Sequence, residues 1–280
     1  MSKETIEKTF AVSGQARLDL SNIRGKVDLR PGKEGSIQVV ADKDTNSGDA
    51  KRTDIELIQE ADGTVKVKTN FPDGSWSWLF GSHPCKVDYT VLAPQRCALN
   101  VNGVSNDLHV EGFEGELSFK SVSGEMSLGN LSGPVKVNTV SGELGIENLA
   151  GDLYLHTVSG NFKGKRVSGS IQMDSVSGKV ELGDSRLDSV QATTISGEIQ
   201  LETPLGKGPY NFKSVSGEIK LSVPAETHCS VEFHSISGNF STELPSSASR
   251  HNGTQNVEVQ GGGVKVYLNS VSGGIRIEHK

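Results

Sequence analysis

The chain has 280 residues, a net charge of −6 and an aromatic content of only 5%. An acidic chain without a Lys/Arg-rich block lacks the basic face that nucleic acids require, so we expect no nucleic-acid partner. The first ten residues carry no apolar leader and no segment is long enough to span a bilayer, so we expect a cytoplasmic protein without a transmembrane segment.

Residues 1–98 are predicted to form an N-terminal β region that is continuous with a regular solenoid over residues 99–280. The motif Val12-Ser13-Gly14 precedes alternating apolar residues, which indicates the first coil. Residues 55–59 and 64–69 alternate around an Asp-Gly pair, which predicts a β-hairpin.

Residues 71–84 form an aromatic loop that contains both tryptophans of the chain. Exposed aromatic side chains mark binding surfaces, so Trp76, Trp78 and Phe80 are the candidate ligand-binding residues. The interpretation that we favour for this loop is nevertheless an apolar plug that covers the side or end of the solenoid, because solenoid ends need covering.

A Val-Ser-Gly tripeptide returns every 18 residues, starting at Val122, Val140, Val158 and Val176. Weaker copies start midway, at Leu131, Leu149 and Val167, so the repeating unit is nine residues long. A repeat of about 20 residues is typical of a stacked, quasi-one-dimensional fold.

Apolar residues occupy the first, fifth and seventh positions of each unit, as in Val140, Leu144 and Ile146. In a strand the fifth and seventh side chains point to one side, and the residue between them, such as Tyr154, points outward. A helix would need a period of about 3.6 residues, which this pattern lacks. We therefore predict an all-β fold, a single-stranded parallel β-solenoid whose coils of 18–21 residues each contain two nine-residue half-coils.

The serines of the tripeptides are predicted to stack as a ladder along one corner of the coils. Hydrogen bonding to turn backbone is the expected role, because no His is repeated beside them to act as a base. The glycine that follows each serine suits a corner where backbones approach closely.

Beyond residue 182 the coils lengthen, with further tripeptides at Ile195, Val215, Ile236 and Val271. The last predicted strand, residues 275–277, has no evident cap. An uncapped strand edge can pair with another chain, so self-association through the solenoid ends is one alternative.

The repeat VSG-E-[ILVM]-x-[LI], the segment SNIRGKVDLRPGKEGSIQVVADK and the lead-in VDYTVLAPQRCALNVNGVSNDLHVEGFEG together resemble the DUF4097 family. That family is also called the adhesin-type or Toastrack domain, and the resemblance covers residues 10–280. It implies a right-handed β-helix without established enzymatic activity. Relatives are often linked to cell-envelope or membrane-stress systems, and the family offers no catalytic motif to transfer.

No P-loop, dinucleotide-binding, HExxH or GxSxG motif is present, so we predict no catalytic residue, metal site or cofactor. His228, Cys229 and His234 form the tightest group of metal-type ligands, but the set is too small. The three cysteines lack CxxC spacing and are expected to be buried free thiols. A disulfide between Cys85 and Cys97 is the alternative, and it would need an oxidising compartment.

The enzymatic alternative uses carboxylates on neighbouring coils, Glu125 with Glu143 or Glu198 with Glu218. Paired carboxylates about 5 Å apart are typical of retaining glycosidases. Lys179 interrupts the row, and a solvated charged edge explains it equally well.

Together these patterns predict a non-enzymatic scaffold or binding protein that presents flat faces to a protein partner or a glycan. The alternatives are a carbohydrate-active enzyme and a self-assembling structural protein.

Overall fold

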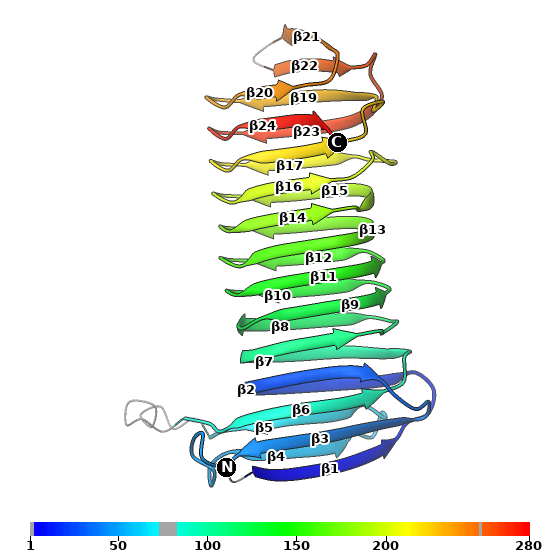
Figure 1. Ribbon diagram of the computed structural model, residues 1–280, viewed down its shortest axis with the longest axis vertical. Helices are drawn as coiled ribbons and strands as arrows, with labels where there is room; N and C mark the ends of the chain where they lie inside the picture. Colours follow the sequence, from blue (N-terminus) through cyan, green and yellow to red (C-terminus); the bar gives the residue numbers. More distant parts are fainter. Residues whose placement is uncertain (1–2, 73–82, 252–253) are drawn as a thin grey trace. The chain divides into compact units, whose positions relative to one another are not determined.

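The computed structural model describes residues 3–72, 83–251 and 254–280, and these form strands and turns (Figure 1). The chain divides into two compact units, Met1–Lys136 and Val137–Lys280, which are described separately below. Many of the strands are parallel, which confirms the predicted all-β solenoid class. The described residues contain no helix that is long and apolar enough to cross a membrane.

Unit 1 is built around parallel pairing of two long strands. Its strands are β1 (Lys3–Ala11), β2 (Ala16–Pro31), β3 (Ser36–Asp44), β4 (Asp54–Gln59), β5 (Val65–Asn70), β6 (Lys86–Ala93), β7 (Cys97–Glu111), β8 (Leu117–Ser123) and β9 (Met126–Ser132). β2 and β7 are parallel, with Leu18 opposite Leu99 and Val27 opposite Leu108. β7 in turn pairs in parallel with β8 and β9.

The other edge of β2 carries the strands that close unit 1. β2 pairs in parallel with β5 and β6, and both of these strands then pair with antiparallel neighbours. β4 and β5 form the predicted hairpin, which is thereby confirmed. β3 lies between β6 and β1 and is antiparallel to both. The parallel stack of unit 1 therefore ends in antiparallel strands, which a further parallel coil cannot extend in register.

Unit 2 is a longer stack of short strands. β10 (Val135–Thr139) spans the boundary, and the strands that follow are β11 (Glu143–Ala150), β12 (Leu153–Thr157), β13 (Asn161–Ser175), β14 (Lys179–Gly183), β15 (Arg186–Thr194), β16 (Glu198–Glu202), β17 (Tyr210–Ser214), β18 (Ile219–Val223), β19 (Cys229–Ser235), β20 (Phe240–Thr242), β21 (Ser246–His251), β22 (Thr254–Val259), β23 (Val264–Ser270) and β24 (Ile275–His279). Leu144 lies opposite Phe162, and Phe162 lies opposite Val180, so neighbouring strands here are one tripeptide repeat apart.

The fifth and seventh positions of the repeats supply the core. Leu144, Ile146 and Leu153 are at most 3% exposed. The large phenylalanines at core positions are at most 1% exposed, and they are Phe119 in unit 1 and Phe162 and Phe212 in unit 2. Period-two patterning thus places one apolar column inside each stack.

The first position behaves differently in the two kinds of repeat. In the weak copies it is buried, as for Leu149 and Val167. In the strong copies it is exposed, with Val158 at 37% and Ile236 at 80%. The strong tripeptides therefore form an outward corner, and their valines belong to the surface.

The predicted serine ladder is confirmed at that corner. Ser159 Oγ donates to the carbonyl oxygen of Val140 at 3.3 Å, and Ser177 Oγ donates to that of Val158 at 3.3 Å. The same bond recurs at Ser196, Ser216, Ser272 and Ser237 in unit 2 and at Ser123 in unit 1. Each serine thus ties its own coil to the neighbouring coil.

The glycines of the corner form a column in which backbones touch. A Cβ atom added to Gly217 would lie 1.9 Å from the carbonyl oxygen of Gly197. One added to Gly273 would lie 2.0 Å from that of Gly217. Real Cβ atoms never approach backbone so closely, so the close stacking itself requires glycine here.

The C-terminal strands lie inside the stack of unit 2. β23 is parallel to both β17 and β19, and β24 is parallel to both β18 and β20. The expectation that the last strand is an uncapped end is therefore wrong, because the chain first runs on through β19–β22 and then returns to fill a gap (Figure 1). Beyond β19 the stack closes with the antiparallel strands β22 and β21.

Candidate functional site

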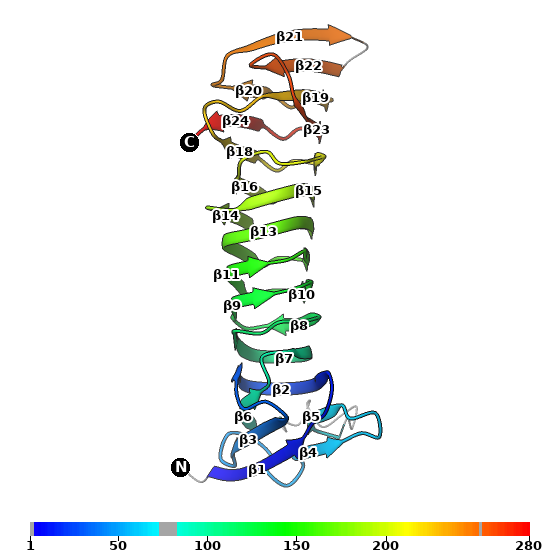
Figure 2. The same cartoon turned by 90° about the vertical axis from the view of Figure 1, so that its right-hand side faces the viewer.

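Unit 2 presents two sheet faces of different chemistry. Figure 2 shows β14 and β16 on one side of this unit and β15 and β23 on the other. One face comprises β12, the second half of β13, β15, β17 and β23, in that order of pairing. The other comprises the first half of β13, β14, β16, β18 and β24.

A straight line of uncharged polar and aromatic side chains crosses the first face. Pairing brings together, strand by strand, the five residues that we call the Tyr–amide row: Tyr154, Gln172, Gln191, Asn211 and Tyr267. Tyr154, which was predicted to point outward, is 46% exposed. Gln172 and Gln191 are also exposed, and the last two members are half-buried.

The row stands on a rigid base. Each of its strands alternates outward residues with core residues, so every member of the row has a buried neighbour on either side. Those neighbours are Leu153, Leu155, Ile171, Met173, Val190, Ala192, Tyr210, Phe212, Val266 and Leu268, all at most 3% exposed. Side chains on packed strands are held more precisely than side chains on loops.

A shallow groove of about 180 Å³ follows the first four members of the row. Asp152, Ser170, Ser189 and Pro209 line its side. The Asp152 carboxylate accepts a hydrogen bond from the backbone N–H of Ser170 at 2.9 Å, which holds that wall in place.

The loop that carries Pro209 is anchored by a buried tyrosine. Tyr210 Oη donates to the carbonyl oxygen of Leu187 at 2.5 Å and accepts from the backbone N–H of Gly206 at 2.6 Å. Burial raises the pKa of this phenol above its ordinary value. The hydroxyl is therefore a neutral clamp that fixes one wall of the groove.

The polar groups of the Tyr–amide row are free to meet a ligand. Across the part of unit 2 that the structure describes, no hydrogen bond or ion pair engages the side chains of Gln172, Gln191 and Asn211. Each amide offers two N–H donors and one carbonyl acceptor. Three neighbouring amides whose donors and acceptors engage none of the described residues form a ready hydrogen-bonding surface.

The second face is charged, and several of its groups pair with one another. Lys179 Nζ lies 2.5 Å from a Glu181 carboxylate oxygen, and Lys220 Nζ lies 2.7 Å from one of Glu278. The hydrogen bond from Lys220 lowers the pKa of Glu278, and that from Lys179 lowers the pKa of Glu181. A groove of about 440 Å³ runs among these residues.

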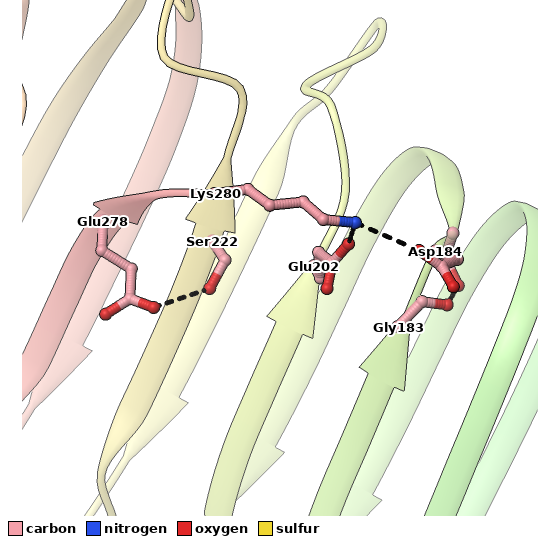
Figure 3. Close-up of polar contacts among 7 residues, drawn as sticks. Gly183, Asp184, Glu202, Ser222, Glu278 and Lys280 are labelled. Carbon is pink, nitrogen blue, oxygen red and sulfur yellow. Dashed lines mark hydrogen bonds and ion pairs between the residues drawn. The ribbon is translucent and has the colours of Figure 1, made fainter.

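Lys280 closes this charged network (Figure 3). Its ammonium contacts Glu202 and also Asp184, the latter at 3.1 Å, and so spans the strands between β24 and β14. The hydrogen bonds to Glu202 and Asp184 raise the pKa of Lys280. Beside it, Ser222 Oγ donates to Glu278 at 3.1 Å. A ligand that contacts Glu181, Lys220 or Glu278 would have to compete with ion pairs, whereas one on the Tyr–amide row would not.

The residues predicted to bind a ligand, Trp76, Trp78 and Phe80, lie outside the described residues. Glu125 and Glu143, one of the two carboxylate pairs, belong to different units. Glu198 is the first residue of β16 and Glu218 directly precedes β18, and the backbone N–H of Ile199 donates to the backbone carbonyl oxygen of Glu218.

Glu198 is already engaged with its own face. Gln200 donates a hydrogen bond to its carboxylate, and Lys179 Nζ lies 4.0 Å away. Neither Glu198 nor Glu218 lines the grooves of unit 2 described above. The arrangement therefore gives Glu198 a structural role on the charged face.

The cysteines are free and buried, as predicted, and Cys85 forms no disulfide with Cys97. Burial raises the pKa of Cys97 to about 12 and that of Cys229 to about 11. Cys229 is buried while His228 and His234 are exposed. Among residues 3–72, 83–251 and 254–280, no three metal-type side chains gather to hold an ion.

Gln191, Asn211 and Tyr267 escaped the sequence prediction, although the repeat contains a signal for them. Counting forward from one tripeptide fails, because the later coils lengthen. Counting back four residues from each following tripeptide places every member of the Tyr–amide row in one register, from Tyr154 before Val158 to Tyr267 before Val271.

Comparison with known proteins supports the architecture. The family model of Toastrack DUF4097 matches residues 16–278. No curated protein matches the chain. The crystal structure of a putative lipid binding protein from Parabacteroides distasonis is similar, with 12% identity and a TM-score of 0.56 over 99% of this chain and 96% of that one.

A second similar structure, a putative adhesin from Bacteroides fragilis, has 14% identity and a TM-score of 0.45 over 100% of this chain and 98% of that one. At such identities the Parabacteroides structure shows the fold alone. The family match covers nearly the whole chain, including all of the strands from β2 to β23. The chain therefore belongs to the Toastrack DUF4097 family.

Proposed function

We propose that this protein is a non-enzymatic, adhesin-like binding scaffold that holds a ligand against the Tyr–amide row of unit 2. The observation that carries the proposal is a line of three amides without partners between two tyrosines, on a packed sheet. Binding sites combine rigid, preformed apolar surface with a small number of polar groups that fix orientation. The row supplies both.

The charge pattern also supports a binding role over catalysis. Of the two predicted carboxylate pairs, the one that lies within a single unit is Glu198 with Glu218, and Glu198 already accepts a hydrogen bond from Gln200. A catalytic acid or base needs a group free to exchange protons with a substrate within hydrogen-bond reach. A structural neighbour carries the name putative lipid binding protein, which is the name of a binding protein.

For the fold we further propose right-handed coils of 18–21 residues, each made of two half-coils of nine residues. The 18-residue steps between Leu144, Phe162 and Val180 support this division. Residues 1–98 then form the N-terminal β region, and the solenoid proper starts at residue 99.

The test blocks one face at a time. Gln191→Arg places a long charged side chain in the groove, and Gln200→Arg places the same side chain on the charged face as a matched control. Wild type and both variants are screened on a glycan array and a panel of purified surface proteins. We expect ligands that bind the wild type and the Gln200→Arg variant and are lost with Gln191→Arg.

Two results would contradict the proposal. Binding that survives Gln191→Arg would place the site elsewhere on the chain. Turnover of a bound glycan that is abolished by Glu198→Gln would make the protein a carbohydrate-active enzyme. Sedimentation of the free protein in the same buffers reports whether it self-assembles.

A further inference from the structure

Resting on the proposed function, we infer that the ligand of the Tyr–amide row is a linear, uncharged, β-1,4-linked polysaccharide. It lies along the stacking direction of unit 2, perpendicular to the strands, with about one sugar residue above each strand. Tyr154 and Tyr267 mark the two ends of the bound segment, and the three amides contact the sugars between them.

The spacing of the row carries the first step. Neighbouring strands in a sheet lie about 4.8 Å apart, close to the roughly 5 Å that one residue adds to an extended β-1,4-linked glycan. Tyr154 and Tyr267 are separated by four strand steps in the pairing order, or about 19 Å. A segment of five sugars therefore matches the row residue by residue.

The chemistry of the row carries the second step. Sugar hydroxyls both donate and accept hydrogen bonds, and so do the unengaged amides of Gln172, Gln191 and Asn211. Sugar rings present apolar C–H faces, which suit the exposed ring of Tyr154 and the half-buried ring of Tyr267. These groups together match a polymer that repeats one amphipathic unit.

The charge distribution carries the third step. No member of the Tyr–amide row is a lysine, arginine, histidine, aspartate or glutamate, and the carboxylates near it include Asp152 in the groove wall and Glu232, which lies opposite Tyr267. An anionic polysaccharide would meet these carboxylates, and no lysine or arginine lines the groove. An uncharged polymer desolvates no charge when it binds.

The shape of the groove selects an extended polymer. The members of the row sit at equivalent positions of successive parallel strands, so they follow a straight line. A β-1,4-linked chain is a straight ribbon that stays in contact with such a line, whereas an α-1,4-linked glucan coils away from it. At about 180 Å³ the groove encloses only part of each sugar, so affinity must accumulate along the row.

The experiment is isothermal titration calorimetry of the whole chain with cello-, xylo- and manno-oligosaccharides of two to six residues. Maltohexaose serves as the coiled control and hexagalacturonate as the anionic control. We expect affinity to rise with length up to five residues and then to level off for at least one β-1,4-linked series. The two control sugars should bind at least about tenfold more weakly.

Variants separate the row from the rest of the surface. Tyr154→Ala and Gln191→Ala should each weaken binding about five- to tenfold, with an unchanged thermal midpoint. Gln200→Ala removes the same kind of side chain from the charged face and should leave the affinity within about twofold of wild type. Tyr154→Ala should also shift the length at which affinity levels off from five to four.

The outcomes distinguish failure of the polysaccharide inference from failure of the proposed binding function. Absence of binding to every β-1,4-linked series, or affinity that does not depend on length, overturns the inference. If only a protein, a lipid vesicle or hexagalacturonate binds, and Gln191→Arg abolishes that binding, the inference fails while the proposed function stands. Length-dependent binding that ignores every substitution in the row refutes both.

Discussion

Replacing one of two adjacent glycines by alanine tests the close backbone stacking of unit 2. Gly273 and Gly274 are neighbours in sequence, and neither has a left-handed backbone. A Cβ on Gly273 would lie 2.0 Å from the carbonyl oxygen of Gly217, whereas one on Gly274 would meet no atom within 4 Å. The two substitutions add the same methyl group, and they differ in the space available for it.

The expected effects have opposite signs. Overpacking typically costs about 1–3 kcal/mol, and the clash of Gly273→Ala falls at the upper end because it meets backbone, which cannot rotate away. Gly274→Ala should stabilise by about 0.4–1 kcal/mol, because alanine restricts the unfolded chain more than glycine does. The difference of about 3–4 kcal/mol corresponds to roughly 10 °C in thermal midpoint for a chain of this size.

The assay is thermal and urea unfolding of both variants, followed by circular dichroism in the strand region. Repeat stacks can unfold in parts, so the midpoint of the first unfolding transition is compared between the variants. Equal midpoints for Gly273→Ala and Gly274→Ala would refute the reasoning, because they would mean that the coils are not stacked as closely as the glycine column requires.

Three further predictions concern buried groups. Burial raises the pKa of Tyr89 to about 12, against about 10 in the unfolded chain, so its neutral form contributes stability that is complete below pH 10 and lost as pH rises towards 12. Tyr89→Phe should reduce the fall of the unfolding midpoint with pH over that range. An unchanged pH dependence would show that Tyr89 does not cause it. The free thiols of Cys85, Cys97 and Cys229 should resist Ellman's reagent at pH 8 until the chain unfolds, and rapid reaction of any one would show that its coil opens. Tyr210→Phe leaves the Leu187 carbonyl and the Gly206 N–H without their partner and should cost about 1–3 kcal/mol in urea unfolding, so a smaller loss would mean that the hydroxyl does not clamp the loop.

The nine-residue repeat and the turn residues predicted those features of the fold that depend on residues close in sequence or one repeat apart. The nine-residue period gave the inward positions of Leu144 and Leu153, and the Asp62-Gly63 turn gave the hairpin of β4 and β5. The serine ladder followed from the same period, because a side chain that recurs once per coil must meet its own copy in the next coil. Each of these inferences uses only neighbours along the chain or one repeat away.

The order of the last coils could not be read in this way. β19 and β23 both alternate apolar and polar residues, so the sequence pattern does not show which of them pairs with β17. The closing strands decide: β22 and β21 pair antiparallel at the outer side of β19 and leave the inner side for β23. The pairing is set by long-range contacts that period counting does not contain.

The first position of the repeat shows a similar limit. Val158 and Val167 have the same residue type in the same place of the unit, yet one is 37% exposed and the other is fully buried. The chain turns outward before the strong tripeptides and inward before the weak ones. Each member of the Tyr–amide row lies four residues before a strong tripeptide. This register could be used only once the structure had shown that the strong tripeptides form an outward corner.

The return of β23 and β24 has a consequence for synthesis on the ribosome. When residue 263 has emerged, the strands up to β22 are complete, but β17 and β18 still lack their final neighbours. Until residues 264–280 follow, the nascent chain exposes open parallel edges on β17, β18, β19 and β20, the kind of template on which chains aggregate. A stop codon placed after residue 263 would preserve that stage, so we expect a chain that ends there to aggregate more readily than the full chain.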